Sequence, residues 1–186
     1  MHGLQAEGRT ALTLRRKSPI WSSVLLVAGI VWATDFVSKD WAQNYLDGKE
    51  PRKILGNLLK LTFTKNSGAA FSFATGGTIL LTAFAILVIF AIGYWAPRIT
   101  SRKWGIVLGL VLGGTLGNLS DRILRANAGT GIMKGQVIDW IELPHWPVFN
   151  LADASIVVAA ASASYLSLRN VSPIVKSHPD GDSHVT

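Results

Sequence analysis

The sequence contains no cysteine and few charged residues. The lack of cysteine excludes a disulfide framework, a thiol nucleophile and a cysteine-containing metal site. Charged residues make up 16% of the 186-residue chain and apolar residues 49%, whereas about a quarter of residues are charged in a typical soluble domain. This composition indicates a membrane protein. Basic residues at the ends of apolar spans are expected in a membrane protein and explain the net charge of +7. We therefore expect no nucleic-acid partner.

Histidine is also scarce, which limits the chemistry open to the chain. Of the four histidines, only His145 lies away from the two ends of the sequence. A serine protease needs a base beside its serine, usually a histidine, and a metal site needs clustered ligands. The glycines do not form a phosphate-binding loop, because no lysine–serine pair follows them. We therefore expect neither a metal nor a cofactor, and carboxylates remain as the candidates for catalysis.

Four long apolar runs are present, each close to the ~20 residues that a membrane-spanning helix needs. They cover residues 20–37, 78–96, 104–119 and 148–168. The first run follows a basic cluster at residues 15–17 and could be a cleaved signal peptide. Because no clear small-x-small cleavage site ends this run, we favour a retained span. The sequence thus predicts an all-α membrane protein with four transmembrane helices.

Positive charge predicts how these helices are oriented. The short loop at residues 97–103 holds Arg98, Arg102 and Lys103, and short basic loops lie in the cytoplasm. With four spans, both termini lie on the same side as this loop. We therefore expect three segments, which are a cytoplasmic tail at residues 1–17, a four-helix membrane domain at 18–169 and a second cytoplasmic tail at 170–186.

The first loop on the outer side has the pattern of a strand. Residues 60–64 alternate polar and apolar side chains, which is the period of a half-buried strand. A stretch of small residues that ends in an aromatic, at 66–71, comes directly after it. This loop is predicted to form a small β-sheet on the outer surface of the membrane.

Small residues recur every four positions in the last two spans. The third span has glycine at positions 105, 109, 113 and 117, and the fourth has Ser155, Ala159, Ala163 and Ser167. In lipid, stripes of small residues let helix backbones approach closely. We expect the two helices to pair through these stripes. Their outer ends, with Asn118 and Arg122 on one helix and Asn150 and Asp153 on the other, then lie side by side.

Aspartates gather near the outer ends of the spans, and the candidates are Asp35, Asp121, Asp139 and Asp153. Two aspartates that share a water can hydrolyse an amide without a cofactor. Like charges held close together cannot both ionise readily, so one aspartate keeps a proton while the other acts as a base. Two of the four have a cation four residues further on, in the pairs Asp35–Lys39 and Asp121–Arg125. This spacing mildly favours Asp139 and Asp153, but it leaves all four aspartates open.

Four short blocks resemble the lipoprotein signal peptidase family, also called signal peptidase II. They are Asn66-Ser67-Gly68-Ala69-Ala70-Phe71-Ser72, then residues 114–122, then 135–140, then 149–153. The resemblance covers residues 35–153. It implies an enzyme of the bacterial cytoplasmic membrane that removes the signal peptide of prolipoproteins, cutting before a diacylglyceryl-modified cysteine. The implied partners are this substrate and membrane lipids, and a monomer is the simplest expectation for a site within one bundle.

The resemblance also implies roles for individual residues. Asp139 and Asp153 match the two catalytic aspartates of the family. The positions implied to support them or the substrate are Asp35, Lys39, Asn66, Gly68, Ala69, Phe71, Asn118, Arg122 and Asn150. Phe36 stands where the family often has glutamine, and the segment at residues 123–134 is longer than the corresponding segment in compact family members. The shape of the second outer loop therefore does not follow from the resemblance.

Two other functions fit a membrane protein with aspartates. A small transporter or proton relay uses aspartates inside the membrane, but it needs polar groups through the bilayer depth, and the second span carries no charge. A non-catalytic assembly built on the small-residue stripes leaves the asparagines and the paired aspartates unexplained. A prolipoprotein cleavage assay separates the protease from both.

Overall fold

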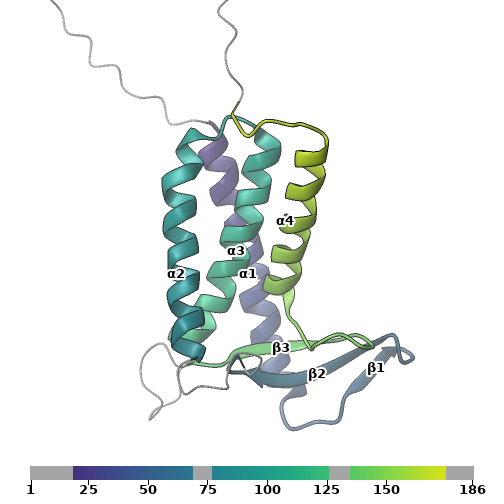
Figure 1. Cartoon of the computed structure of the whole chain (residues 1–186). Coiled ribbons are helices and arrows are strands. Elements are labelled where there is room, and N and C mark those ends of the chain that lie inside the picture. The colour runs from purple at the N-terminus through teal and green to yellow at the C-terminus, as the bar shows by residue number, and fades with distance from the viewer. Residues whose placement is uncertain (1–18, 69–76, 126–134, 175–186) are drawn as a thin grey trace, which may run out of the picture.

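The computed structural model describes residues 19–68, 77–125 and 135–174. In these residues, four helices lie side by side, and a small sheet lies across one end of the bundle (Figure 1). All four helices are long and apolar enough to cross a membrane. Large apolar side chains such as Phe84 and Phe90 point outward, at 61% and 72% exposure. The predicted fold class, four transmembrane helices with a small sheet, is confirmed.

The helices correspond closely to the predicted spans. They are α1 (Pro19–Leu46), α2 (Gly77–Trp95), α3 (Arg102–Leu124) and α4 (Leu151–Leu168), with a 3₁₀ turn η2 (Ala96–Arg98) after α2. The one large difference is that α1 continues well beyond residue 37. Its last turns are held because Ala42 and Leu46 pack against Ile138 in a small apolar cluster beneath the sheet. The start of α1 and the end of α4 lie at the end of the bundle opposite the sheet (Figure 1).

The sheet has three antiparallel strands in the order β1 (Arg52–Leu55), β2 (Leu59–Asn66) and β3 (Val137–Glu142). The predicted strand is confirmed as part of β2, and the loop between α1 and α2 supplies β1 as well. The third strand comes from the loop between α3 and α4, whose shape the sequence left open. In the register between β2 and β3, Thr64 lies opposite Asp139 and Asn66 lies opposite Val137. This register brings Asn66 close to Asp139.

The glycine stripe of α3 faces α1, and in this respect the prediction that it faces α4 was wrong. A methyl group at Gly109 would lie 2.7 Å from Cβ of Val27, and one at Gly113 would lie 2.6 Å from Cβ of Val31. Helix α4 does pack on α3 as predicted, but at Gly114, where a methyl group would lie 2.5 Å from the carbonyl oxygen of Ala152. A stripe at four-residue spacing occupies one face of a helix, and the sequence does not say which neighbour fills it.

We expect Gly113→Ala to lower the stability of the protein, because the added methyl group meets the carbonyl oxygen of Ala28 at 2.7 Å. Overpacking of this kind costs about 1–3 kcal/mol. Gly93→Ala in α2 is the matched control, since nothing lies within 4 Å of that position. Thermal denaturation of the two purified variants in detergent measures the difference. Equal denaturation temperatures would contradict the close contact between α1 and α3.

Candidate active site

The four aspartates come together at the sheet end of the bundle, as predicted, from four different elements. Asp35 lies on α1, Asp121 on α3, Asp139 on β3 and Asp153 on α4. The first three are almost fully buried, with 0%, 1% and 2% of their surface exposed. Buried carboxylates need partners, because removal of a charge from water is costly. Their partners divide the four aspartates into two pairs.

Asp139 is held by two asparagine amides. Nδ2 of Asn66 donates to its Oδ2 at 2.9 Å, and Nδ2 of Asn150 donates to its Oδ1 at 2.6 Å. Burial raises the pKa of Asp139 to about 6; the nearby Asp153 raises it too, while the two amides and the charge of Lys39 lower it. The carboxyl group therefore changes its protonation state well above the range of an ordinary aspartate.

Asp153 is placed by the start of α4. Asn150 is the N-cap residue, and its Oδ1 accepts the backbone N–H of Asp153 at 2.9 Å. In return, Oδ2 of Asp153 accepts the backbone N–H of Asn150 at 3.3 Å, which completes a capping box. The local sequence Asn150-Leu151-Ala152-Asp153 thus both begins α4 and orients the carboxylate of Asp153.

Asn118 links the two carboxylates through Asn150. Nδ2 of Asn118 donates to Oδ1 of Asp153 at 2.7 Å, and its Oδ1 accepts from Nδ2 of Asn150 at 3.1 Å. Asn150 in turn donates to Asp139. The predicted side-by-side placement of Asn118 and Asn150 is therefore confirmed. The two amides form a continuous chain of hydrogen bonds between Asp153 and Asp139.

Asp35 and Asp121 are the other pair, and each is neutralised by a cation. Lys39 lies 2.7 Å from Asp35, and Nε of Arg125 lies 2.9 Å from Asp121. These are the two ion pairs that the four-residue spacing predicted. Within the described residues, neither Asp139 nor Asp153 has a lysine or arginine within ion-pair distance. Asp139 and Asp153 are therefore the two carboxylates whose partners are neutral amides.

A tight turn after β2 orients Asn66. Gly68 adopts a positive φ of 86°, a conformation that glycine reaches without strain. Its backbone N–H donates to Oδ1 of Asn66 at 2.8 Å. This bond leaves Nδ2 of Asn66 pointing at Asp139. The two other residues that the sequence placed in this segment, Ala69 and Phe71, lie outside the described residues.

Arg122 is buried at the same end of α3, with 8% of its surface exposed. Among the described residues, its Nη1 has no hydrogen-bond partner. A guanidinium group carries several N–H donors in a fixed geometry, and this buried donor is unmatched by any described acceptor. Among the described residues, no group of three or more histidine, cysteine, aspartate or glutamate side chains is arranged to hold a metal ion.

The sequence kept Asp121 among the four candidate aspartates, but the family resemblance gave it no role in the site. The structure brings it into the same cluster, where it lies 2.9 Å from Nζ of Lys39. Its spacing to Arg125 was a visible signal of an ion pair. Its contact with Lys39 joins α3 to α1, and no local pattern in the sequence reports a contact of that kind.

Fold and site together define a multi-pass membrane protein with a buried carboxylate centre at one end of its bundle. The model of the family described as signal peptidase (SPase) II matches residues 27–169. The chain is 41% identical to the lipoprotein signal peptidase of Rhodococcus jostii over 150 residues, which cover 81% of this chain and 74% of that protein. For the lipoprotein signal peptidase of Mycobacterium avium, the identity is 42% over 145 residues, or 78% of each chain. The chain belongs to the signal peptidase II family and is a membrane protease.

Solved structures agree on the fold. Two structures of a bacterial membrane enzyme superpose on the chain with TM-scores of 0.71 and 0.69, each at 22% sequence identity. The match to the first structure covers 81% of this chain and 95% of the chain in that structure. The four-helix bundle with its small sheet is therefore the fold of that enzyme as well.

Proposed function

We propose that this protein is an aspartic endopeptidase of the bacterial cytoplasmic membrane, with Asp139 and Asp153 as its catalytic pair. Its substrates are prolipoproteins, and it cuts before the diacylglyceryl-modified cysteine. The observation that carries the proposal is the chain of amides from Asp139 through Asn150 and Asn118 to Asp153. The relatives named as lipoprotein signal peptidases support the choice of substrate.

In this mechanism Asp139 begins with the proton, because its raised pKa keeps the carboxyl group neutral to a higher pH than in an ordinary aspartate. Asp153 takes a proton from a water, and the resulting hydroxide adds to the carbonyl carbon of the scissile peptide. As the carbon–nitrogen bond breaks, Asp139 gives its proton to the departing nitrogen. The products are a carboxylic acid and an amine, and a proton transfer from Asp153 to Asp139 resets the pair.

Other polar residues would bind the substrate at this site. Arg122 has a donor without a partner among the described residues, and it can donate to a carbonyl or phosphate oxygen of the bound lipopeptide. The exposed apolar surface of the helices would keep the acyl chains in the membrane beside the site. A single chain supplies Asp139, Asp153 and the amides between them, so we propose that the enzyme acts as a monomer.

The orientation follows from the basic loop between α2 and α3. This loop lies at the end of the bundle opposite the sheet, and its positive charge supports a cytoplasmic location for that end. The site then faces the outer side of the membrane, where the substrate cysteine lies. The domain at residues 18–169 carries the activity, and the tails at 1–17 and 170–186 are cytoplasmic.

The test is a cleavage assay with purified protein in detergent and a synthetic prolipoprotein that carries the diacylglyceryl group. Mass spectrometry of the products is expected to show one cut, directly before the modified cysteine. The same peptide without the lipid serves as the control and is expected to remain uncut. A purified, folded protein that leaves the lipidated peptide intact would exclude this function and favour a transporter or an assembly protein.

We expect the pH dependence of kcat/KM to report Asp139. Because the mechanism needs its proton, kcat/KM falls as the pH rises through about 6. Asn66 donates a hydrogen bond to this carboxylate, which stabilises the charged form and lowers the pKa. In Asn66→Ala the pKa is higher, so the fall in kcat/KM moves to a higher pH.

The control for this measurement is Asn44→Ala, because Asn44 is exposed on α1 and bonds only to Asp40 among the described residues. Its pH profile is expected to match that of the wild type. A profile that stays in place or moves to a lower pH in Asn66→Ala would contradict the assignment of the proton to Asp139.

A further inference from the structure

The two aspartates that are not proposed to act on substrate each hold the backbone next to one that is. Oδ1 of Asp35 accepts the backbone N–H of Ala152 at 2.9 Å, and Ala152 directly precedes Asp153. Oδ2 of Asp121 accepts the backbone N–H of Ile138 at 3.1 Å, and Ile138 directly precedes Asp139. A carboxylate that accepts a backbone N–H makes a strong, charge-assisted bond. Each proposed catalytic aspartate is therefore preceded by a residue whose backbone N–H is held by another carboxylate, Asp35 or Asp121. We call these two carboxylates the anchors.

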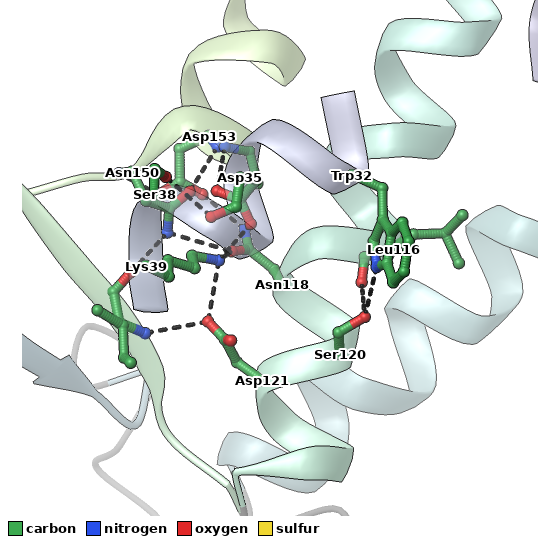
Figure 2. Close-up of polar contacts among 12 residues, drawn as sticks. Trp32, Asp35, Ser38, Lys39, Leu116, Asn118, Ser120, Asp121, Asn150 and Asp153 are labelled. Carbon is green, nitrogen blue, oxygen red and sulfur yellow. Dashed lines mark hydrogen bonds and ion pairs between the residues drawn. The ribbon is translucent and has the colours of Figure 1, made fainter. Parts of the chain in front are cut away.

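Lys39 joins these two anchors. Its ammonium lies 2.7 Å from Oδ2 of Asp35 and 2.9 Å from Oδ2 of Asp121, and it donates to Oδ1 of Asn118 at 3.0 Å. Figure 2 shows its side chain between Asp35, Asn118 and Asp121. An ammonium carries three hydrogens, and three oxygens lie within reach of them. None of the surface of Lys39 is exposed.

Burial makes this arrangement stiff. An unpaired charge in a protein interior costs several kcal/mol, so Lys39 cannot leave either carboxylate without a large penalty. The contact with Asn118 also fixes that amide, because its Oδ1 faces the ammonium and its Nδ2 therefore faces Asp153. One cation thus acts on both of the elements that carry the catalytic pair, on α4 through Asp35 and on β3 through Asp121.

Gly117 of α3 leaves room for the side chain of Asp35. A methyl group at Gly117 would lie 2.5 Å from Oδ2 of Asp35 and 3.1 Å from Cβ of Ala152. Only a residue without a side chain lets Asp35 reach across α3 to the start of α4. Gly117 belongs to the glycine stripe, but at this position the stripe accommodates a carboxylate where its other members accommodate valine or isoleucine.

We propose that Asp35, Lys39 and Asp121 form a positioning unit that sets the separation between Asp139 and Asp153. The proposal rests on the proposed function of that pair. The three residues do not touch the substrate; they hold the backbone before each catalytic carboxylate and the amide of Asn118. A displacement of about 1 Å at a catalytic group can lower a rate about 10²-fold. Loss of the unit therefore acts on kcat, and the binding of substrate changes little.

The first test is Lys39→Met, measured as kcat and KM on the folded protein. We expect kcat to fall about 10²-fold and KM to stay within about threefold. Lys60→Met is the matched control, because Lys60 pairs with Glu142 between β2 and β3 at 2.8 Å but is partly exposed. Its kcat is expected to remain within about twofold of the wild type, since exposed ion pairs contribute little.

Two further variants keep the test decisive if Lys39→Met does not fold. The double variant Asp35→Asn with Lys39→Met removes two opposite charges together, so it recovers most of the thermal stability, yet its kcat stays low. Gly117→Ala removes no charge but pushes Asp35 aside, and we expect a fall in kcat of about tenfold or more. Folded protein with wild-type kcat in the double variant or in Gly117→Ala would overturn the positioning unit.

Failure of the positioning unit can be told apart from failure of the proposed function. Wild-type cleavage of the lipidated peptide, together with an inactive Asp139→Asn variant, first establishes the catalytic pair. A wild-type kcat in the variants of the positioning unit then counts against that unit alone. A wild-type protein that does not cleave the peptide counts against the proposed function.

Discussion

Asp139→Asn and Asp153→Asn are each expected to lower the rate of prolipoprotein cleavage by about 10⁴-fold or more. Each proton transfer by a positioned side chain contributes about 10²–10⁴-fold, and an amide can neither take the proton of the water nor supply one to the leaving amine. The two residues act as a unit, so the double variant is expected to be no slower than either single one. Initial rates with the lipidated peptide, followed by chromatography, measure the loss.

Stability must be measured beside activity in these variants. Both oxygens of Asp139 accept N–H groups, from Asn66 and Asn150, so the new amide nitrogen faces a donor whichever way it turns. A buried donor without an acceptor costs about 1–3 kcal/mol. We therefore expect a lower denaturation temperature for Asp139→Asn, with the protein still folded at the assay temperature.

Asp47→Asn is the matched control for the loss of a carboxylate. Asp47 is 47% exposed and lies 3.7 Å from Lys65, in an ion pair at the surface. We expect its cleavage rate to be within about twofold of the wild type, because such pairs contribute little. If Asp139→Asn and Asp153→Asn, once shown to be folded, cleave as fast as Asp47→Asn, the catalytic pair is wrongly assigned.

Asn150→Ser is the second change with a large expected effect, and it separates two roles of one side chain. Asn150 caps α4 through its Oδ1, and through Nδ2 it donates to Asp139 and to Asn118. Serine is about as good an N-cap as asparagine, so helix stability is expected to change by less than about 0.5 kcal/mol. The amide donors are lost, and we expect kcat to fall about 10²-fold as Asp139 and Asn118 lose their common partner.

Asn150→Ala completes this comparison. It removes the cap as well as the donors, which adds about 1 kcal/mol of lost stability. We expect Asn150→Ala to denature at a lower temperature than Asn150→Ser, with kcat equally low in both. Thermal denaturation and steady-state kinetics on the same preparations measure the two effects. A wild-type kcat in a folded Asn150→Ser would show that the amide does not position the pair.

Features that depend on residues close together in the sequence were predictable without the structure. The length of each apolar run set the four spans, because the bilayer has a fixed thickness. The alternation at residues 60–64 predicted a strand, which is confirmed in β2. The ion pairs of Asp35 with Lys39 and of Asp121 with Arg125 followed from a four-residue spacing, which brings side chains together on any helix.

Contacts between distant parts of the chain, by contrast, became visible only in the folded protein. The glycine stripe faces α1, and the loop between α3 and α4 supplies β3, because packing over the whole chain sets which elements become neighbours. The separation of the four aspartates into an amide-linked pair and a Lys39-linked pair has the same origin. Asp35 reaches the N–H of Ala152, 117 residues away, and no periodicity in a sequence encodes a contact at that distance.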